Sequence, residues 1–335
     1  MKKQILFLTI ILAFLKTTAQ HTVDIGIASG VVNYVGDLGN EKYFPISSVS
    51  PGCQVTIRNF LKTSARTYKP LSMEFRLSWH RLQYDETEAI GNSRGTELRN
   101  YLRGIGFRND LFGASANFLY TFYPNPYASS QKNQFCYFLL AGVGVYHGIP
   151  KADLFHGKAA PANRYYFWAD GTVRDAAESP GAVANIIGKD GEYETNLQEW
   201  RTEGQGYNPE LEQKKPYHFT NIGFPFGAGI RCMMNRKVTL SLEFDYYYFL
   251  TDYLDDVSGR YATYEELASS FSDPQQLAMA KYISDPTGRG TNGTLKGISP
   301  RGNPNKNDSY TFISFEVSYK FLLHRKSLWN YISAR

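Results

Sequence analysis

Histidine and carboxylate side chains are the first candidates for chemistry in this 335-residue chain. The six histidines are scattered, and no two stand at a spacing typical of metal ligands. His147 and Asp252 each fall near the end of an expected strand, where they could meet as an acid–base pair at the rim of a barrel enzyme. The chain contains no nucleophile elbow, phosphate-binding loop or zinc motif. The sequence therefore favours ordinary rim polarity over catalysis, and it predicts no metal site and no cofactor.

Carboxylates concentrate in the stretch that contains Asp252, Asp255 and Asp256. Clustered carboxylates can bind Ca²⁺, but their spacing here is not that of an EF-hand loop. The expected structure is a capped turn that is exposed to solvent. Whether the stretch binds an ion stays open.

Charged side chains also recur at alternate positions within expected strands. Successive side chains of a strand point to opposite faces, so these charges share one face and apolar residues share the other. Four are basic and four acidic, and such charges are tolerated away from water only when they pair. We expect an ion-pair network that fills the interior of a narrow barrel; a gated proton or ion path is the alternative. The eight residues are Arg58, Glu74, Arg76, Arg231, Glu243, Asp245, Glu316 and Lys320.

The segment 238–251 shows the alternation most clearly. Its apolar face ends in tyrosines, as expected where a lipid-facing strand meets the headgroups. The segment 310–321 repeats the pattern, and six more strands are expected at 22–34, 52–60, 71–84, 108–123, 135–146 and 217–233. Pro225 interrupts the sixth strand in chain order and requires a bulge or a late start of its membrane-embedded part.

The connections between these strands alternate between long and short along the chain. Bacterial outer-membrane barrels show this rhythm, with long loops outside the cell and tight turns in the periplasm. The sequence therefore predicts an all-β fold: an eight-stranded antiparallel transmembrane β-barrel over residues 20–335, with large extracellular loops at 147–216 and 252–308. Two short helices are expected within the second loop, on either side of Asp273 and Pro274.

Residues 1–19 have the features of a signal peptide: two lysines, an apolar run and a small-residue cleavage site. No later run of about 18 apolar residues predicts a membrane helix. The net charge of +5 is not concentrated in a basic block, so no nucleic-acid partner is expected. The three cysteines fall within expected strands and are interpreted as small apolar residues. Lipids of a Gram-negative outer membrane are the expected surroundings.

Several motifs together resemble those of PorG-like outer-membrane barrels, which are associated with the type IX secretion and gliding apparatus. They include Asn33–Leu38 with Asp37, Thr202–Gly206 with Glu203, Gly204 and Gly206, and the acidic stretch Thr251–Ser258 with Asp252, Asp255 and Asp256. The glycine-containing stretches at 141–145 and 225–229 complete the set. The resemblance implies a non-enzymatic component that docks the periplasmic ring of the secretion machine, formed by a lipoprotein and its partner.

Under this interpretation the periplasmic face comprises the turns at 61–70, 124–134 and 235–237 and the basic tail 324–335. Two other functions stay open. One is an OmpA-type structural or adhesion barrel that binds ligands through its surface loops. The other is a barrel protease or acyltransferase.

Overall fold

The computed structural model describes residues 22–38, 48–60, 70–86, 96–122, 135–206, 208–211, 213–235, 237–291 and 300–322. The expected signal peptide, most of the turns at 61–70 and 124–134, and the tail 324–335 lie outside these residues. No helix within the described ranges is long and apolar enough to cross a membrane.

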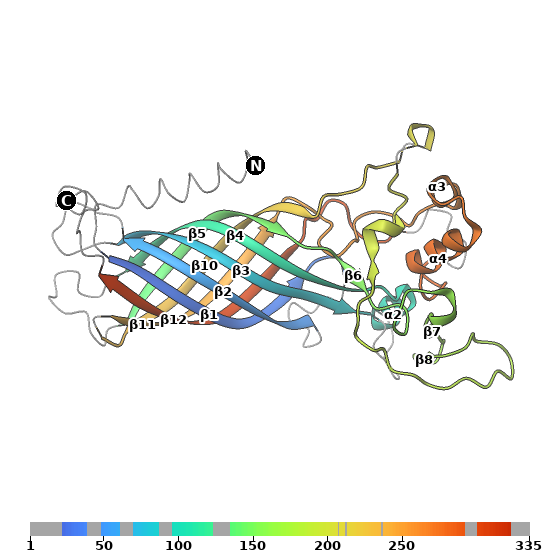
Figure 1. Ribbon diagram of the computed structural model, residues 1–335, viewed down its shortest axis with the longest axis horizontal. Helices are drawn as coiled ribbons and strands as arrows, with labels where there is room; N and C mark the ends of the chain where they lie inside the picture. The colour runs from blue at the N-terminus through green and yellow to red at the C-terminus, as the bar shows by residue number, and fades with distance from the viewer. Residues whose placement is uncertain are drawn as a thin grey trace, which may run out of the picture.

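Eight long antiparallel strands in the described part of the chain close into a barrel (Figure 1). Each strand pairs with its neighbour in sequence, and β1 pairs with β12 to complete the ring. The predicted fold class is therefore confirmed. The strands are β1 Thr22–Val35, β2 Val49–Phe60, β3 Leu71–Asp85, β4 Gly106–Phe122, β5 Phe135–His147, β10 Thr220–Met233, β11 Val238–Phe249 and β12 Ser309–Leu322.

The two faces of the barrel wall differ as the alternation requires. Apolar side chains on the outer face are widely exposed, for example Ile27 at 67 %, Leu77 at 61 % and Phe135 at 63 %. Polar and charged residues at the intervening positions are buried inside. A continuous apolar band of this extent around a closed barrel is unfavourable in water and matches a lipid environment. The barrel is thus of the membrane-spanning type.

Pro225 is accommodated in a way that the sequence did not indicate. β10 keeps one register with β5 on both sides of this residue, with Gly223 opposite Gly144 and Phe226 opposite Ala141. The pairing with β5 lapses only at Phe224 and Pro225, while Pro225 stays paired with Tyr247 of β11. There is no bulge at Pro225, because its missing N–H falls where the hydrogen bonding to β5 is locally interrupted.

The long connections fold together at one end of the barrel into a cap (Figure 1). Within the described residues it contains three helices: α2 Thr96–Arg103, α3 Tyr264–Ser270 and α4 Pro274–Ser284. The last two confirm the expected pair, with Asp273 as the N-cap of α4; α2 was not expected, because its residues read as a polar loop. The cap also contains the short strands β6 Lys151–Ala152, β7 Tyr166–Phe167, β8 Val173–Arg174 and β9 Thr195–Asn196, and the 3₁₀ turns Pro161–Asn163, Leu197–Trp200 and Pro209–Leu211.

An apolar core joins the cap to the barrel. It begins inside the barrel with aromatic side chains such as Tyr247, Phe249 and Phe312, and it continues into the cap through Phe155 and Tyr165. The alternation placed Tyr247 and Phe249 on the polar face but gave no hint that aromatic residues gather there. The cap end of the lumen is therefore filled by packed rings rather than by water.

Candidate functional site

Two arginines organise the charged residues in the middle of the lumen. Arg58 pairs with Glu74 and, at 3.1 Å, with Glu316. Arg76 pairs with Glu74, with Glu243 and, at 2.7 Å, with Asp245. Each of these side chains is at most 2 % exposed. Six of the eight residues that the sequence grouped together thus form one connected network.

The other two members of the expected set lie at the edge of this network. Arg231 donates from Nε to the hydroxyl of Ser241 at 3.4 Å, and its guanidinium lies 4.5 Å from the ring centroid of Phe138. Lys320 stands opposite Asp24 in the β1–β12 register. Asp24 is buried and was missed as a site residue, although its position on the polar face of β1 was the available signal.

Close packing leaves little free space around the network. Thr56 donates to Glu316 at 2.7 Å, and a Cβ on the neighbouring Gly26 would come within 2.5 Å of the Thr56 hydroxyl. Nearer the cap, His80 lies 2.8 Å from the Tyr310 hydroxyl, and its ring centroid lies 4.3 Å from that of Phe312. Among the described residues, ion pairs and rings thus occupy successive levels of the lumen and link its strands to one another.

A second buried polar cluster, which we call the junction, attaches the cap to the barrel. It contains Asp255 and Asp256, both fully buried, so the expectation of a solvent-exposed turn at 252–256 is wrong. Packing of the cap over this loop removes it from water, and loop sequence alone does not encode that packing. The further members are Tyr34, Asp37, Thr202, Glu203, Tyr217, Asp252, Arg301 and Asp308.

Asp256 is a junction carboxylate with three side-chain partners. It accepts hydrogen bonds from Thr202 at 2.5 Å and Tyr217 at 2.7 Å, and it lies 3.2 Å from the guanidinium of Arg301. Burial raises the pKa of the Asp256 carboxyl to about 6, with Arg301 acting in the opposite direction. Its backbone φ of 67° lies in the left-handed region, which favours glycine. The fold therefore maintains a locally unfavourable backbone where three distant segments meet.

Glu203 ties the longest loop to the segment after β11. Its carboxylate accepts from the backbone N–H groups of Ser258 at 2.8 Å and Gly259 at 3.0 Å. The adjacent Gly204 has a φ of 73°, and a Cβ there would lie 2.5 Å from a carboxylate oxygen of Glu266. The N–H of Gly206 donates to the carbonyl of Lys214 at 2.9 Å.

Asp37 and Asp255 connect the end of β1 to the same cluster. Tyr34 donates its hydroxyl proton to Asp255, and the N–H of Asn303 donates to Asp37. Burial raises the pKa of Asp252 to about 7. The structure thus brings together motif residues from three segments that lie far apart in the sequence.

His147 and Asp252 do not form the acid–base pair that an enzyme would need. His147 is exposed on the outer face of β5, where its Nδ1 lies 3.0 Å from the Thr220 hydroxyl. Asp252 is buried at the junction. No hydrogen bond or ion pair joins the two side chains within the described residues. The enzymatic hypothesis therefore lacks its proposed site.

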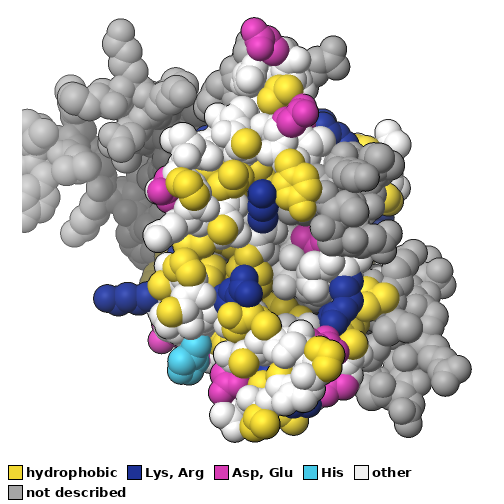
Figure 2. All heavy atoms as spheres, turned by 90° about the vertical axis from the view of Figure 1, so that its right-hand side faces the viewer, with side chains coloured by type: hydrophobic (Ala, Val, Ile, Leu, Met, Phe, Trp, Pro, Cys, Tyr) yellow, Lys and Arg dark blue, Asp and Glu magenta, His cyan; other side chains and the backbone are white. Residues whose placement is uncertain are grey.

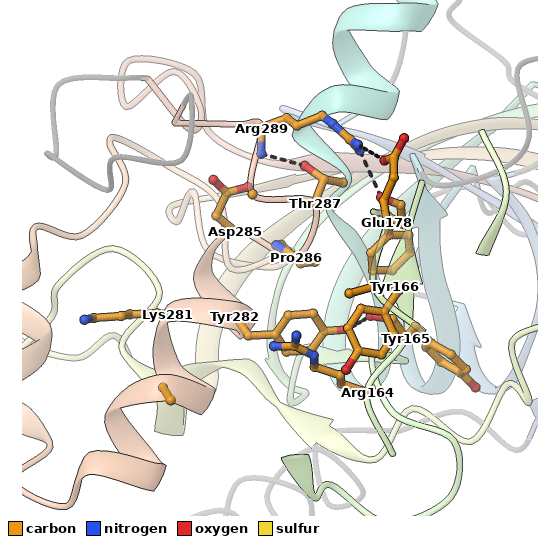
Figure 3. A pocket seen from close by; sticks show the side chains of 14 residues that line it. Arg164, Tyr165, Tyr166, Glu178, Lys281, Tyr282, Asp285, Pro286, Thr287 and Arg289 are labelled. Atoms are coloured by element: carbon orange, nitrogen blue, oxygen red, sulfur yellow. Dashed lines mark hydrogen bonds and ion pairs between the residues drawn. The ribbon is translucent and has the colours of Figure 1, made fainter. Parts of the chain in front are cut away.

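A recess of about 380 Å³ opens on the cap between α4 and the β7–β8 hairpin (Figure 3). The Arg164 guanidinium lies 4.4 Å from the Tyr166 ring centroid and 5.7 Å from that of Tyr282. Arg289 bridges to Glu178 at 2.6 Å (Figure 3). Figure 2, which faces the cap end, shows basic side chains among hydrophobic ones near the middle of this face. Aromatic walls with guanidinium groups suit a planar or anionic ligand.

Comparisons with known proteins give structural likeness alone. No family model matches the chain, and no curated protein matches it. The solved structures that it resembles include surface protein A of Neisseria, with 10 % identity over 89 % of this chain and 97 % of that one and a TM-score of 0.34. They also include the attachment invasion locus protein Ail of Yersinia pestis (6 % identity, 90 % and 99 % coverage, TM-score 0.33) and the outer-membrane enzyme PagL (11 % identity, 89 % and 98 % coverage, TM-score 0.26). The fold assignment itself rests on the strand register above.

Proposed function

We propose that this protein is a non-enzymatic component of the type IX secretion machinery, held in the outer membrane of a Gram-negative cell, that anchors or docks the periplasmic ring. The observation that carries the anchoring role is the filled lumen: Arg58 and Arg76 pair with four carboxylates where a conduit would need water. An eight-stranded barrel filled in this way is a membrane anchor. The secretion machine itself is proposed from the motif resemblance.

The junction adds to this proposal by giving the motif residues a role. Asp37, Glu203 and Asp256 hold the cap on the barrel, and none of them lies at the opposite end of the strands. A docking surface for the ring is then expected at that opposite end, which includes the β10–β11 turn with the exposed Lys237. The cap would face outward from the cell.

Deletion of the gene tests the secretion role directly. We expect export of type IX cargo proteins to stop, while the outer membrane keeps its barrier to detergents and large antibiotics. Normal export in the deletion strain would refute the secretion role.

Site-specific photocrosslinking tests the docking surface. A crosslinker in place of Lys237 should capture the ring lipoprotein or its partner, whereas a crosslinker in place of the exposed Tyr264 of the cap should not. Capture of ring proteins from the cap position alone would contradict the proposed orientation.

A second candidate, a structural or adhesion barrel that binds ligands through its surface, is favoured by the recess beside Arg164 and Tyr282. Arg164→Glu should then abolish binding to the surface ligand and leave cargo export unchanged. Under the docking proposal, the same variant should have no effect on export or on attachment.

A further inference from the structure

A set of three carboxylates in the cap lies away from both the lumen and the junction. Asp153 directly follows β6, and Glu194 directly precedes β9. The antiparallel register of these two strands, with Ala152 opposite Thr195, places Asp153 across from Glu194. Asp190 comes from the loop just before β9, and one carboxylate oxygen from each of the three residues lies within 4.8 Å of the others.

Two of these carboxylates, the buried Asp153 and the partly buried Glu194, each have one oxygen without a hydrogen-bond partner within the described residues. Asp153 is 5 % exposed; its Oδ2 accepts from the N–H of Gly191 at 2.8 Å, and its Oδ1 has no partner within the described residues. Glu194 accepts through Oε1 from the N–H groups of Leu154 and Phe155, both at 3.1 Å, and its Oε2 is likewise without a partner in the described part of the chain. Both unpartnered oxygens are themselves buried, and a buried carboxylate oxygen without a donor is costly, so they point to a missing positive group.

Two neighbouring cations, Lys189 and Arg108, contact other groups, and His156 contacts only Asp190 of the three carboxylates. Lys189, whose charge acts on Asp153, places its ammonium 2.8 Å from Asp85. Arg108 lies over the ring of Tyr193 at 4.3 Å. His156 is 3.5 Å from Asp190 and its side chain is 72 % exposed. Within the described residues, no ion pair joins Asp153 or Glu194 to a cation, and burial raises the pKa of Asp153 to about 6.

We propose that Asp153, Asp190 and Glu194 bind a divalent cation, with Ca²⁺ as the ion. Its preferred ligands are carboxylate oxygens, supplemented by backbone carbonyls and water in a flexible geometry. Mg²⁺ fits less well, because it demands a near-ideal octahedron and gives up its water reluctantly. Ca²⁺ sites of extracellular modules have dissociation constants on the order of 10⁻⁴–10⁻³ M, and we expect the same range here.

The position of the site gives the ion a structural role. Asp153 and Asp190 bracket the segment 154–189, which contains the β7–β8 hairpin and one wall of the recess with Arg164 and Glu178 (Figure 3). An ion at the base of this segment would fasten both of its ends to the β6–β9 pair. Calcium binding would therefore order the recess wall and leave the stability of the barrel strands unchanged. This inference is independent of the proposed secretion role.

Terbium luminescence and Ca²⁺ titration of the full-length protein in detergent micelles test the site. Tb³⁺ should bind saturably, Ca²⁺ should displace it, and Mg²⁺ at the same concentration should not. Asp153→Asn and Glu194→Gln should each weaken binding by about tenfold or more. Asp170→Asn is the matched control, because this carboxylate lies in the same segment but pairs with Arg174, and it should bind like the unmodified protein.

Hydrogen exchange of the unmodified protein provides a second readout that does not depend on how the variants fold. Calcium should slow exchange in the segment 154–189 relative to a chelator, and the β11 strand should not respond. Absence of saturable Ca²⁺ binding up to about 10 mM, well above the expected range, would overturn the proposal. Unchanged affinity in Asp153→Asn, or equal protection by Mg²⁺, would also overturn it.

Discussion

At the scale of single residues, the charges of the lumen depend on one another. Arg76 contacts three carboxylates, of Glu74, Glu243 and Asp245, and Glu74 also contacts Arg58. A buried ion pair gains little over an apolar replacement of the whole group, but the loss of one partner leaves a charge without compensation. Removal of any one charged side chain therefore destabilises the network. Arg76 is the member whose removal affects the most buried carboxylates.

Arg76→Met should destabilise the barrel by about 3–5 kcal/mol, because three buried carboxylates lose their shared cation. Urea unfolding in lipid vesicles, followed by tryptophan fluorescence, measures this change. The control is Arg81→Met: Arg81 and Asp110 form a pair with about 30 % of each side chain exposed, and its loss should cost about 0–1 kcal/mol. Equal costs for the two variants would contradict an energetic role of the network.

The raised pKa values of Asp252 and Asp256 lead us to expect that the stability of the cap's attachment to the barrel depends on pH. Burial raises their pKa values to about 7 and about 6, whereas an unfolded aspartate titrates near about 3.9. A raised folded-state pKa contributes stability that is complete below about pH 4 and is lost as the pH rises through the folded pKa values. The junction should therefore loosen between about pH 5 and 8.

Hydrogen exchange of residues 252–258, corrected for the intrinsic pH effect, should be faster at pH 8 than at pH 5. Asp252→Asn should reduce this difference, since the amide cannot ionise. Asp170→Asn should leave it unchanged, because Asp170 is exposed and its pKa is lowered by hydrogen bonds from Thr172. A pH-independent exchange rate in the unmodified protein would contradict the expectation.

At the scale of elements, alternation decides the environment of each strand residue. In β11, Leu242 and Phe244 are 55 % and 43 % exposed, while the intervening Glu243 is 2 % exposed. These positions follow from the two-residue period of a strand and were predicted from sequence. The junction was not predicted from sequence, because its members lie mostly in loops without a regular period. These residues meet only when the cap packs on the barrel.

Leu242→Arg should disturb the barrel according to its depth in the membrane. Leu242 lies near the middle of β11, so a charge there should cost about 2–4 kcal/mol; Leu250→Arg, just beyond the end of the strand, should cost about 0–1 kcal/mol. Unfolding from vesicles compares the two variants. The same cost at both positions would place the lipid boundary elsewhere.

At the scale of the whole molecule, a sealed barrel carries a folded cap at one end (Figure 1). The ion-pair network fills the middle of the lumen, and the aromatic core around Tyr247 and Phe312 closes the cap end. The junction then joins this plug to the surface of the cap. In the part of the chain that the structure describes, side chains therefore fill the lumen where a channel would need open space.

Planar bilayers that contain the purified protein should show no conductance above the bare membrane. The reason is that rings and paired charges replace the water that ions would need. A 16-stranded porin in the same bilayers is the positive control, because such barrels leave an aqueous channel. Discrete openings of the unmodified protein would contradict the sealed lumen and favour the gated path that the sequence left open.

The sequence by itself determined the barrel. The two-residue period in eight segments determines which side chains face lipid. The alternation of long and short connections determines that all long loops, and with them the cap, lie at one end of the barrel. The sequence also placed Arg58, Glu74, Arg76 and the other charged residues on a common inner face, although it did not determine which carboxylate each arginine contacts. These features are local, since each follows from neighbours along one strand.

Tertiary structure alone decided the rest. Three examples join segments of irregular loops: the burial of Asp255 and Asp256, the contacts of both Thr202 and Arg301 with Asp256, and the approach of Asp153 to Glu194. Irregular backbone has no repeat that relates sequence position to direction, so the side-chain contacts of loops depend on the packing of the whole cap. The physical reason is that the two-residue period of a strand determines which face of the sheet a side chain is on. Which other side chain it contacts depends on the three-dimensional packing.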